Sequence, residues 1–189
     1  MKSTPVDKIQ RLYFVALVPP EPIKSQVWQM KEEVLEKYGS KAALKSPAHV
    51  TLHMPFTFRV DREDRIIDCL KTAIADKKQF EITHDGFGCF EPRVIYVNVD
   101  KTEPLEILKA DVVKQMRLDL KLQNADYKNL PFHPHMTIAF RDLKKPVFQE
   151  AWTAYENREY RASWKCDSVC LLKHNGAGWD VLEEIGFNV

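Results

Sequence analysis

The alternation of apolar and polar residues along the chain predicts a mixture of strands and helices. Short apolar or alternating runs bounded by Gly, Pro or Asn are typical of strands, whereas apolar residues spaced by three or four positions are typical of amphipathic helices. We therefore expect strands at residues 12–18, 48–58, 80–83, 94–99, 132–140, 163–173 and 179–187. We expect helices from the segment 19–22 to residue 38 and at residues 62–77, 104–120 and 147–157.

Proline and glycine refine three of these elements. Pro55 lies inside the second predicted strand and indicates an edge strand or a break, because proline cannot donate to a sheet ladder. The segment Asp85–Gly88 contains two glycines and predicts a loop. The segment His174–Gly178 predicts a hairpin that joins the last two strands.

The order of the predicted elements contains an internal repeat. A strand–helix–strand unit followed by a helix occurs in the first half and roughly recurs in the second. This pattern indicates an α/β (α+β) fold that is pseudo-duplicated, with a cleft between the two halves. Because no linker or low-complexity segment interrupts the chain, residues 1–189 are expected to form a single domain of two lobes.

Composition narrows the classes of protein to consider. The chain of 189 residues is 44% apolar and 29% charged, which is typical of a globular protein. Lysine and arginine number 28 against 27 acidic residues, so the net charge is +1, and this argues against a protein that coats duplex DNA. We see no signal peptide and no apolar run long enough to span a membrane. The four scattered cysteines are expected to be reduced, and the protein cytoplasmic.

Two copies of a His-x-Thr motif carry the clearest chemical signal. His49 and Thr51 lie in one predicted strand, and His135 and Thr137 lie in another. Residues i and i+2 of a strand point to the same face, so each motif presents an imidazole beside a hydroxyl. Imidazole can act as a base or an acid near neutral pH, and the hydroxyl can donate to a phosphoryl oxygen. Two such motifs across a phosphodiester would supply a base and an acid, without a metal or a cofactor.

These motifs and their surroundings resemble a known family. The segments that carry the resemblance are Arg11–Leu17, His49–Leu52, Phe90–Val97, Pro134–Ile138 and Val169–Leu172. They resemble the two-histidine (2H) phosphoesterase superfamily, which includes RNA 2',3'-cyclic phosphodiesterases and 2'-5' RNA ligase-like proteins. The resemblance implies mostly antiparallel sheets that line a central cleft, with helices packed outside and both motifs at the centre. It also implies a metal-independent phosphodiesterase that acts on cyclic phosphates or 2'-5' linkages.

Several residues outside the motifs are candidates for substrate binding. Arg93 precedes a predicted strand and is a candidate phosphate contact. Family members often carry a basic residue just beyond the second motif, where this chain has Arg141 after two intervening residues. Phe56, Phe90 and Tyr96 are candidates for stacking on a base. The expected partners are RNA ends or cyclic nucleotides, bound by a monomer without membrane association.

Two further histidines leave other functions open. His53 and His133 share strand parity with the motif histidines, so four imidazoles could line one cleft and hold a metal ion as in a histidine–metal hydrolase. We assign no metal ligands, because neither motif contains an acidic residue and the threonines would then have no purpose. A third hypothesis is a nucleotide-binding or RNA-end-binding module without catalysis.

Overall fold

The computed structural model describes residues 9–125 and 130–188, which form helices and strands in alternation. The helices are α1 (Ile23–Tyr38), α2 (Glu63–Ala73), α3 (Glu103–Leu120) and α4 (Lys145–Tyr155), with short 3-10 turns η2 (Ala42–Lys45) and η3 (Val60–Arg62). The strands are β1 (Gln10–Leu17), β2 (Val50–Arg59), β3 (Phe80–Asp85), β4 (Phe87–Phe90), β5 (Val94–Asn98), β6 (His135–Ala139), β7 (Arg161–Cys166), β8 (Ser168–His174) and β9 (Trp179–Gly186).

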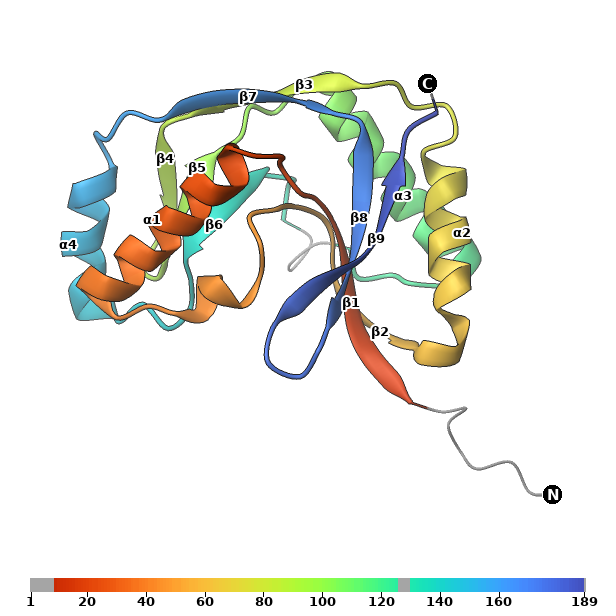
Figure 1. Cartoon of the computed structure of the whole chain (residues 1–189), viewed down its shortest axis with the longest axis horizontal. Coiled ribbons are helices and arrows are strands. Elements are labelled where there is room, and N and C mark those ends of the chain that lie inside the picture. The colour runs from red at the N-terminus through yellow and green to blue at the C-terminus, as the bar shows by residue number, and fades with distance from the viewer. Residues whose placement is uncertain (1–8, 126–129, 189) are drawn as a thin grey trace.

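The strands form three sheets, and every strand pair is antiparallel. The sheet orders are β2-β1-β8-β9, β3-β7 and β4-β5-β6. Figure 1 shows the four-stranded sheet beside α2 and α3, the three-stranded sheet beside α1 and α4, and the β3–β7 ribbon running across the top of both. The predicted α/β class with antiparallel sheets is confirmed, and Pro55 lies in β2, which is an edge strand as predicted.

The predicted repeat corresponds to two units, β1-α1-β2 and β5-α3-β6. In each unit the helix joins two strands that pair with each other. The helices are exchanged, because α1 packs against β6 and α3 packs against β2. Each unit therefore buries the apolar side of its helix against the second strand of the other unit, which ties the two halves together.

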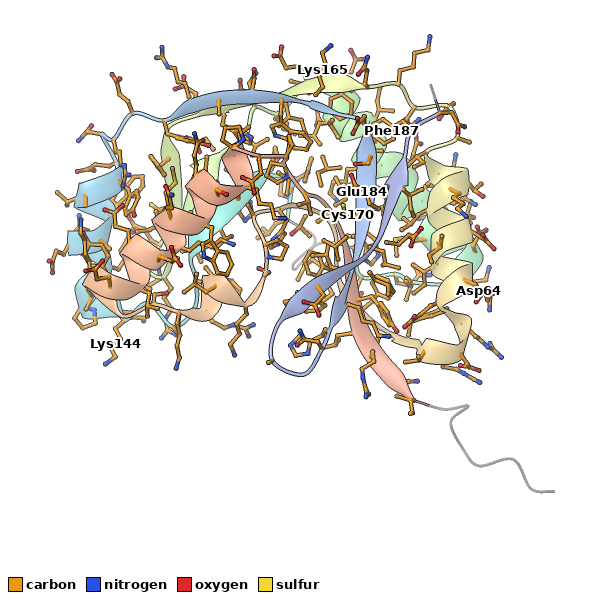
Figure 2. All side chains as sticks on the ribbon, in the orientation of Figure 1. Asp64, Lys144, Lys165, Cys170, Glu184 and Phe187 are labelled. Atoms are coloured by element: carbon orange, nitrogen blue, oxygen red, sulfur yellow. The ribbon has the colours of Figure 1, made fainter. Side chains whose placement is uncertain are left out.

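Buried apolar side chains lie on both faces of the four-stranded sheet. Tyr13 and Val15 of β1 belong to a large cluster that includes residues of all four helices. Phe14 and Ala16 point to the opposite face, because side chains alternate along a strand, and they pack with Cys170 and Leu172 in a small second cluster. Cys170 is labelled in Figure 2 at strand β8 of this sheet. This second face is the one that carries the first His-x-Thr motif.

The single strand predicted at residues 163–173 is wrong, because the structure divides it into β7 and β8. β7 pairs with β3, whereas β8 pairs with β1 and β9. The chain changes sheets at Asp167, whose carbonyl accepts a hydrogen bond from the Phe187 amide. Buried residues alternate before this point, at Trp164 and Cys166, and are consecutive after it, at 169–172. The polar pair Asp167 and Ser168 between them was the signal of a break.

The loop predicted at Asp85–Gly88 is also wrong, because β3 continues to Asp85 and β4 begins at Phe87. Gly86 alone makes the corner, with a φ of 65°. Gly88 is part of the β4 strand, where a Cβ would lie 2.5 Å from the Tyr96 ring. Its glycine therefore makes room for an aromatic ring on the neighbouring strand rather than for a turn.

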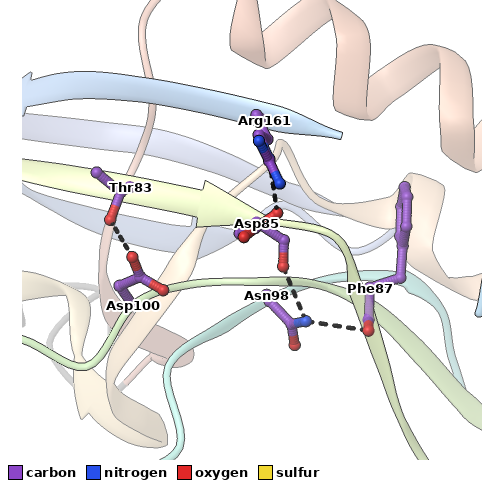
Figure 3. A network of polar contacts seen from close by, with 6 residues as sticks. All are labelled: Thr83, Asp85, Phe87, Asn98, Asp100 and Arg161. Atoms are coloured by element: carbon purple, nitrogen blue, oxygen red, sulfur yellow. Dashed lines mark hydrogen bonds and ion pairs between the residues drawn. The ribbon is translucent and has the colours of Figure 1, made fainter. Parts of the chain in front are cut away.

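Polar contacts hold the β3–β7 ribbon against β5. Asn98 donates to the carbonyls of Asp85 and Phe87, and Arg161 pairs with the Asp85 carboxylate (Figure 3). His84 of the ribbon is buried, and its Nδ1 lies 3.1 Å from the Asn98 carbonyl, while Trp164 donates to its Nε2 at 3.0 Å. These contacts fix the connection that runs between the two halves.

The structure also bears on several smaller expectations. The predicted strand at residues 132–140 is shorter than expected, because β6 begins at His135 and the preceding residues run outside the sheet. The predicted hairpin is confirmed, because His174–Gly178 joins β8 to β9. All four cysteines are free, as expected. No helix in residues 9–125 or 130–188 is long and apolar enough to cross a membrane.

Candidate functional site

The first motif lies where η2 leads into β2. His49 directly precedes β2 and Thr51 is its second residue, and both side chains are half-buried. Thr51 pairs with Ala16 of β1, and the His49 ring lies 4.9 Å from the Phe14 ring. The motif therefore lies on the same face of the four-stranded sheet as the small apolar cluster.

The second motif occupies the matching place in the other unit. His135 is the first residue of β6 and Thr137 is the third, and both are half-buried. Thr137 pairs with Tyr96 of β5, and the His135 ring lies 4.9 Å from the Tyr96 ring. Each motif thus begins the second strand of its unit, where α1 and α3 cross from one half to the other.

Both imidazoles are oriented in the same way. Nδ1 of His49 is 2.8 Å from the carbonyl oxygen of Pro47, and Nδ1 of His135 is 2.7 Å from the carbonyl oxygen of His133. A carbonyl can only accept a hydrogen bond, so Nδ1 must carry the proton in both rings. Nε2 is then the nitrogen of each ring that can exchange a proton with a substrate.

Both motif histidines have lowered pKa values. Burial is the main cause that lowers the pKa of His49 to about 4, and the charges of Lys31 and, more weakly, His135 lower it further. Burial also lowers the pKa of His135, while its bond to the His133 carbonyl opposes the shift. The charge of His135 reaches His49, and the strands β2 and β6 are in contact with each other. Both are neutral in the free protein at pH 7.

A buried lysine binds the backbone that directly precedes the first motif. Lys31 of α1 is 1% exposed, and its Nζ donates to the carbonyls of Ser46 and Pro47 at 2.9 and 3.1 Å. Sequence reasoning missed this residue. It was detectable, because Lys31 falls on the same helical stripe as the apolar residues Val27 and Val34.

Asp142 connects the segment that precedes the first motif with the segment that follows strand β6, which carries the second motif. Its carboxylate accepts hydrogen bonds from the Ser40 hydroxyl and from the backbone amides of Lys41 and Ala42. These amides lie at the start of η2, where a carboxylate can cap the unpaired donors of the turn. Asp142 follows β6, so the contact ties the segment before His49 to the strand that carries His135.

Aromatic side chains surround the second motif. Phe90 of β4 is 41% exposed, and its ring lies 4.6 Å from Tyr96 and 5.1 Å from His135. The Tyr96 side chain is buried, and its hydroxyl is 3.0 Å from Nε2 of the exposed His133. The structure therefore brings together His135, His133, Tyr96 and Phe90.

The two arginines predicted as phosphate contacts lie at one end of the three-stranded sheet. Arg141 follows the last residue of β6, Ala139, whereas His135 is the first residue of that strand. Arg93 donates to the Arg141 carbonyl at 3.2 Å, and both arginines are exposed. The structure therefore brings these two residues together beyond the end of β6.

Phe56 and His53 correct two further expectations. The Phe56 side chain is 7% exposed and packs against Tyr13 and His53, so it belongs to the core instead of presenting a face to a base. His53 is fully buried, and its Nδ1 is 2.8 Å from the carbonyl of Met54. His53 is thus part of the protein interior and is not a fourth imidazole facing a substrate.

A groove of about 670 Å³ lies beside the first motif. It runs between α1 and the β8–β9 hairpin, over the backbone of residues 44–48 that leads to His49. Trp28 and Trp179 line it, together with Lys24 and Lys45. Trp179 also contacts Phe14, which in turn contacts His49, so the groove adjoins the first motif through two rings.

The described part of the chain contains no cluster of side chains that could bind a metal ion. Among residues 9–125 and 130–188, no group of three or more His, Cys, Asp or Glu side chains is placed to hold an ion. The histidine–metal hypothesis was motivated by four imidazoles that could line one cleft, and His53, which is buried, is not exposed to such a cleft.

Comparison with known proteins identifies relatives of this fold. A model of the 2'-5' RNA ligase superfamily matches residues 19–178. E. coli LigT complexed with 3'-AMP is similar with a TM-score of 0.71 and 18% identity, over 96% of this chain and 100% of that one. TT0787 of Thermus thermophilus has a TM-score of 0.66 and 18% identity, over 93% of this chain and 97% of its own.

A third solved structure has a related architecture. The MHV ns2 PDE domain is 15% identical, with a TM-score of 0.53 over 93% of this chain and 99% of that domain. At these identities the structural matches show a shared fold. No curated protein sequence matches the chain.

Proposed function

The chain belongs to the 2'-5' RNA ligase superfamily of two-histidine phosphoesterases, and we propose that His49 and His135 cleave a cyclic phosphodiester by general acid–base catalysis. The observation that carries the proposal is the matched orientation of the two imidazoles. Each Nδ1 is bonded to the carbonyl two residues upstream, and each Nε2 is left to face the reacting group. A pair of oriented imidazoles meets the requirement for one base and one acid.

The reaction involves one bond made and one broken at phosphorus. Nε2 of one histidine takes a proton from a water molecule as its oxygen attacks the phosphorus of a 2',3'-cyclic phosphate. Nε2 of the other histidine gives a proton to the ribose oxygen that leaves, so the product is a phosphomonoester. Thr51 and Thr137 donate to the non-bridging phosphoryl oxygens, whose charge rises in the transition state.

The proposed substrates are RNA ends, cyclic nucleotides or 2'-5' linkages. E. coli LigT, which shares the fold, has been solved with 3'-AMP and with ATP, so this architecture can hold a nucleotide. We propose that Tyr96 positions the second motif and that Arg93 and Arg141 contact phosphates of the strand beyond the reacting one. The net charge of +1 favours such short ligands over duplex DNA. We further propose a cytoplasmic monomer whose two halves are lobes of a single domain.

A substrate panel after exhaustive EDTA treatment tests this function. The panel consists of 2',3'-cyclic nucleotides, short RNAs with a cyclic phosphate end and 2'-5' oligonucleotides. We expect turnover of at least one class to persist without metal and to be lost in His49→Ala and His135→Ala. Activity that returned only with added zinc or manganese would support the histidine–metal hydrolase instead. Ligand binding without turnover, unaffected by either substitution, would support a non-catalytic binding module.

A further inference from the structure

Lys31 is a charged residue placed where the fold otherwise buries apolar groups. Its side chain is 1% exposed, and its two hydrogen bonds go to the main-chain carbonyls of Ser46 and Pro47. Burying an ammonium group is costly unless polar partners compensate it. A methionine would fill the same place on the apolar stripe of α1 at no such cost, so the charge calls for an explanation beyond packing.

The Pro47 carbonyl joins this lysine to the first motif. The same oxygen accepts from Nζ of Lys31 at 3.1 Å and from Nδ1 of His49 at 2.8 Å. Lys31 therefore holds the acceptor that orients the imidazole, and its positive charge is held close to the ring. A nearby positive charge disfavours a second one, so it favours the neutral imidazole with a lone pair on Nε2.

The second motif has a similar arrangement, with a histidine in the place of the lysine. The His133 carbonyl orients His135, and the His133 ring is held by the Tyr96 hydroxyl. The charge of His133 also lowers the pKa of His135, but less than the hydrogen bond to the His133 carbonyl raises it. At His49 the order is reversed, because the charge of Lys31 lowers the pKa more than the hydrogen bond to the Pro47 carbonyl raises it. The two histidines are alike in orientation and differ in this support.

We propose that Lys31 is the positioning residue that makes His49 the general base and leaves His135 to act as the general acid. The inference rests on the proposed two-histidine function and adds the assignment of roles. Lys31 acts through the Pro47 carbonyl and through its charge, and it does not contact the substrate.

The titration of Lys31 itself fits this role. Burial lowers the pKa of Lys31 to about 7, so its charge is complete below neutrality. That is the range in which an ordinary histidine would become protonated and lose its capacity as a base. The charged groups that act on His49 are Lys31 from α1 and His135 from β6. The lysine therefore opposes protonation of His49 at the pH values where it matters.

Histidine-resolved NMR titration of the full chain tests the proposal without relying on activity. In Lys31→Met we expect the pKa of His49 to rise by roughly one pH unit, as for removal of a nearby charge, while that of His135 stays in place. Lys31→Arg keeps the charge and should keep the pKa of His49 low. Lys109→Met is the matched control, because Lys109 is also buried and donates to the Leu52 carbonyl but is not among the charges that act on His49.

Kinetics with two substrates test the assignment of roles. The acidic limb of kcat/KM should move to higher pH in Lys31→Met by the same amount as the pKa of His49. A substrate with sulfur at the leaving position needs no acid, so it should restore His135→Ala and not His49→Ala. Rescue of His49→Ala alone would overturn the assignment while leaving the two-histidine function intact. Full activity of both alanine variants would instead contradict that function.

The wild type decides the matter if Lys31→Met does not fold. The His49 resonances should then show a second, small inflection near pH 7, where Lys31 titrates, and the pKa of His49 should lie below that of His135. A pKa of His49 equal to or above that of His135, without this inflection, would overturn the proposal. So would an unchanged pKa of His49 in a folded Lys31→Met variant.

Discussion

The first motif rests on a buried ammonium group, whereas the second is set among aromatic rings and an exposed histidine. Locally the two are almost the same, with a histidine at the start of a strand, a threonine two residues later and Nδ1 bound to a carbonyl. The two motifs differ in the side chain close to that carbonyl, which is Lys31 at the first motif and His133 at the second. A duplicated motif can therefore supply two opposite proton-transfer roles, because each copy takes its electrostatic environment from the elements packed beneath it.

The largest expected effects come from removing either imidazole. His49→Ala and His135→Ala should each lower kcat by ~10²–10⁴-fold, which is the usual contribution of a positioned acid or base. Both side chains are only half-buried, so we expect the two variants to fold. Circular dichroism and thermal unfolding can check this. If one variant kept full activity, the two motifs would not be equal partners in one reaction.

The threonines should give smaller effects of similar size in the two motifs. Each hydroxyl is expected to donate to a charged oxygen, an interaction worth about 1.5–3 kcal/mol. Thr51→Val and Thr137→Val should therefore slow turnover by ~10–100-fold, with the fold retained because valine suits a strand. Steady-state kinetics with one cyclic nucleotide would measure both. Wild-type rates in both variants would reduce the threonines to strand-forming residues.

The pH dependence of kcat/KM should reflect the lowered pKa values of both histidines. Since kcat/KM reports the free enzyme, both limbs of the bell should lie below pH 6.5, the acidic one near the pKa of about 4 for His49. The proton donor is lost as pH rises through the upper limb, so kcat/KM should fall about tenfold between pH 6.5 and 7.5. An optimum above pH 7 would show that substrate or solvent reverses the effect of burial on these rings.

The sequence predicted the two motifs because strand periodicity alone places His-x-Thr side chains on one face. It also predicted the repeated strand–helix–strand units and the hairpin at His174–Gly178. It could not show that α1 and α3 are exchanged between the units, because tertiary packing decides this. It left the place of His53 open and offered Phe56 as a residue that stacks on a base, since strand parity does not distinguish the cleft face from the core. The sequence could not show a link between Lys31 and His49, because the two residues are joined through the Pro47 carbonyl in the folded structure.

The smallest expected effect comes from removing the Tyr96 hydroxyl, which contacts His133 beside the second motif. Tyr96→Phe removes the hydroxyl that binds Nε2 of His133 but keeps the ring that packs against Phe90 and His135. The net loss of a neutral hydrogen bond is about 0.5–1.5 kcal/mol. We therefore expect kcat to fall by ~2–10-fold and KM to stay constant, because Tyr96 acts through His133.

The pH profile of Tyr96→Phe distinguishes the effect of the Tyr96 hydroxyl from the effect of the Lys31 charge. Removing a neutral hydroxyl should leave both limbs of kcat/KM in place, whereas Lys31→Met should move the acidic limb. A rise in KM without a change in kcat would mean that Tyr96 binds the substrate directly. If Tyr96→Phe moved the pKa of His135 as far as Lys31→Met moved that of His49, the charge of Lys31 would have no special effect. The two motifs would then differ in packing alone, and another feature would have to assign the base and the acid.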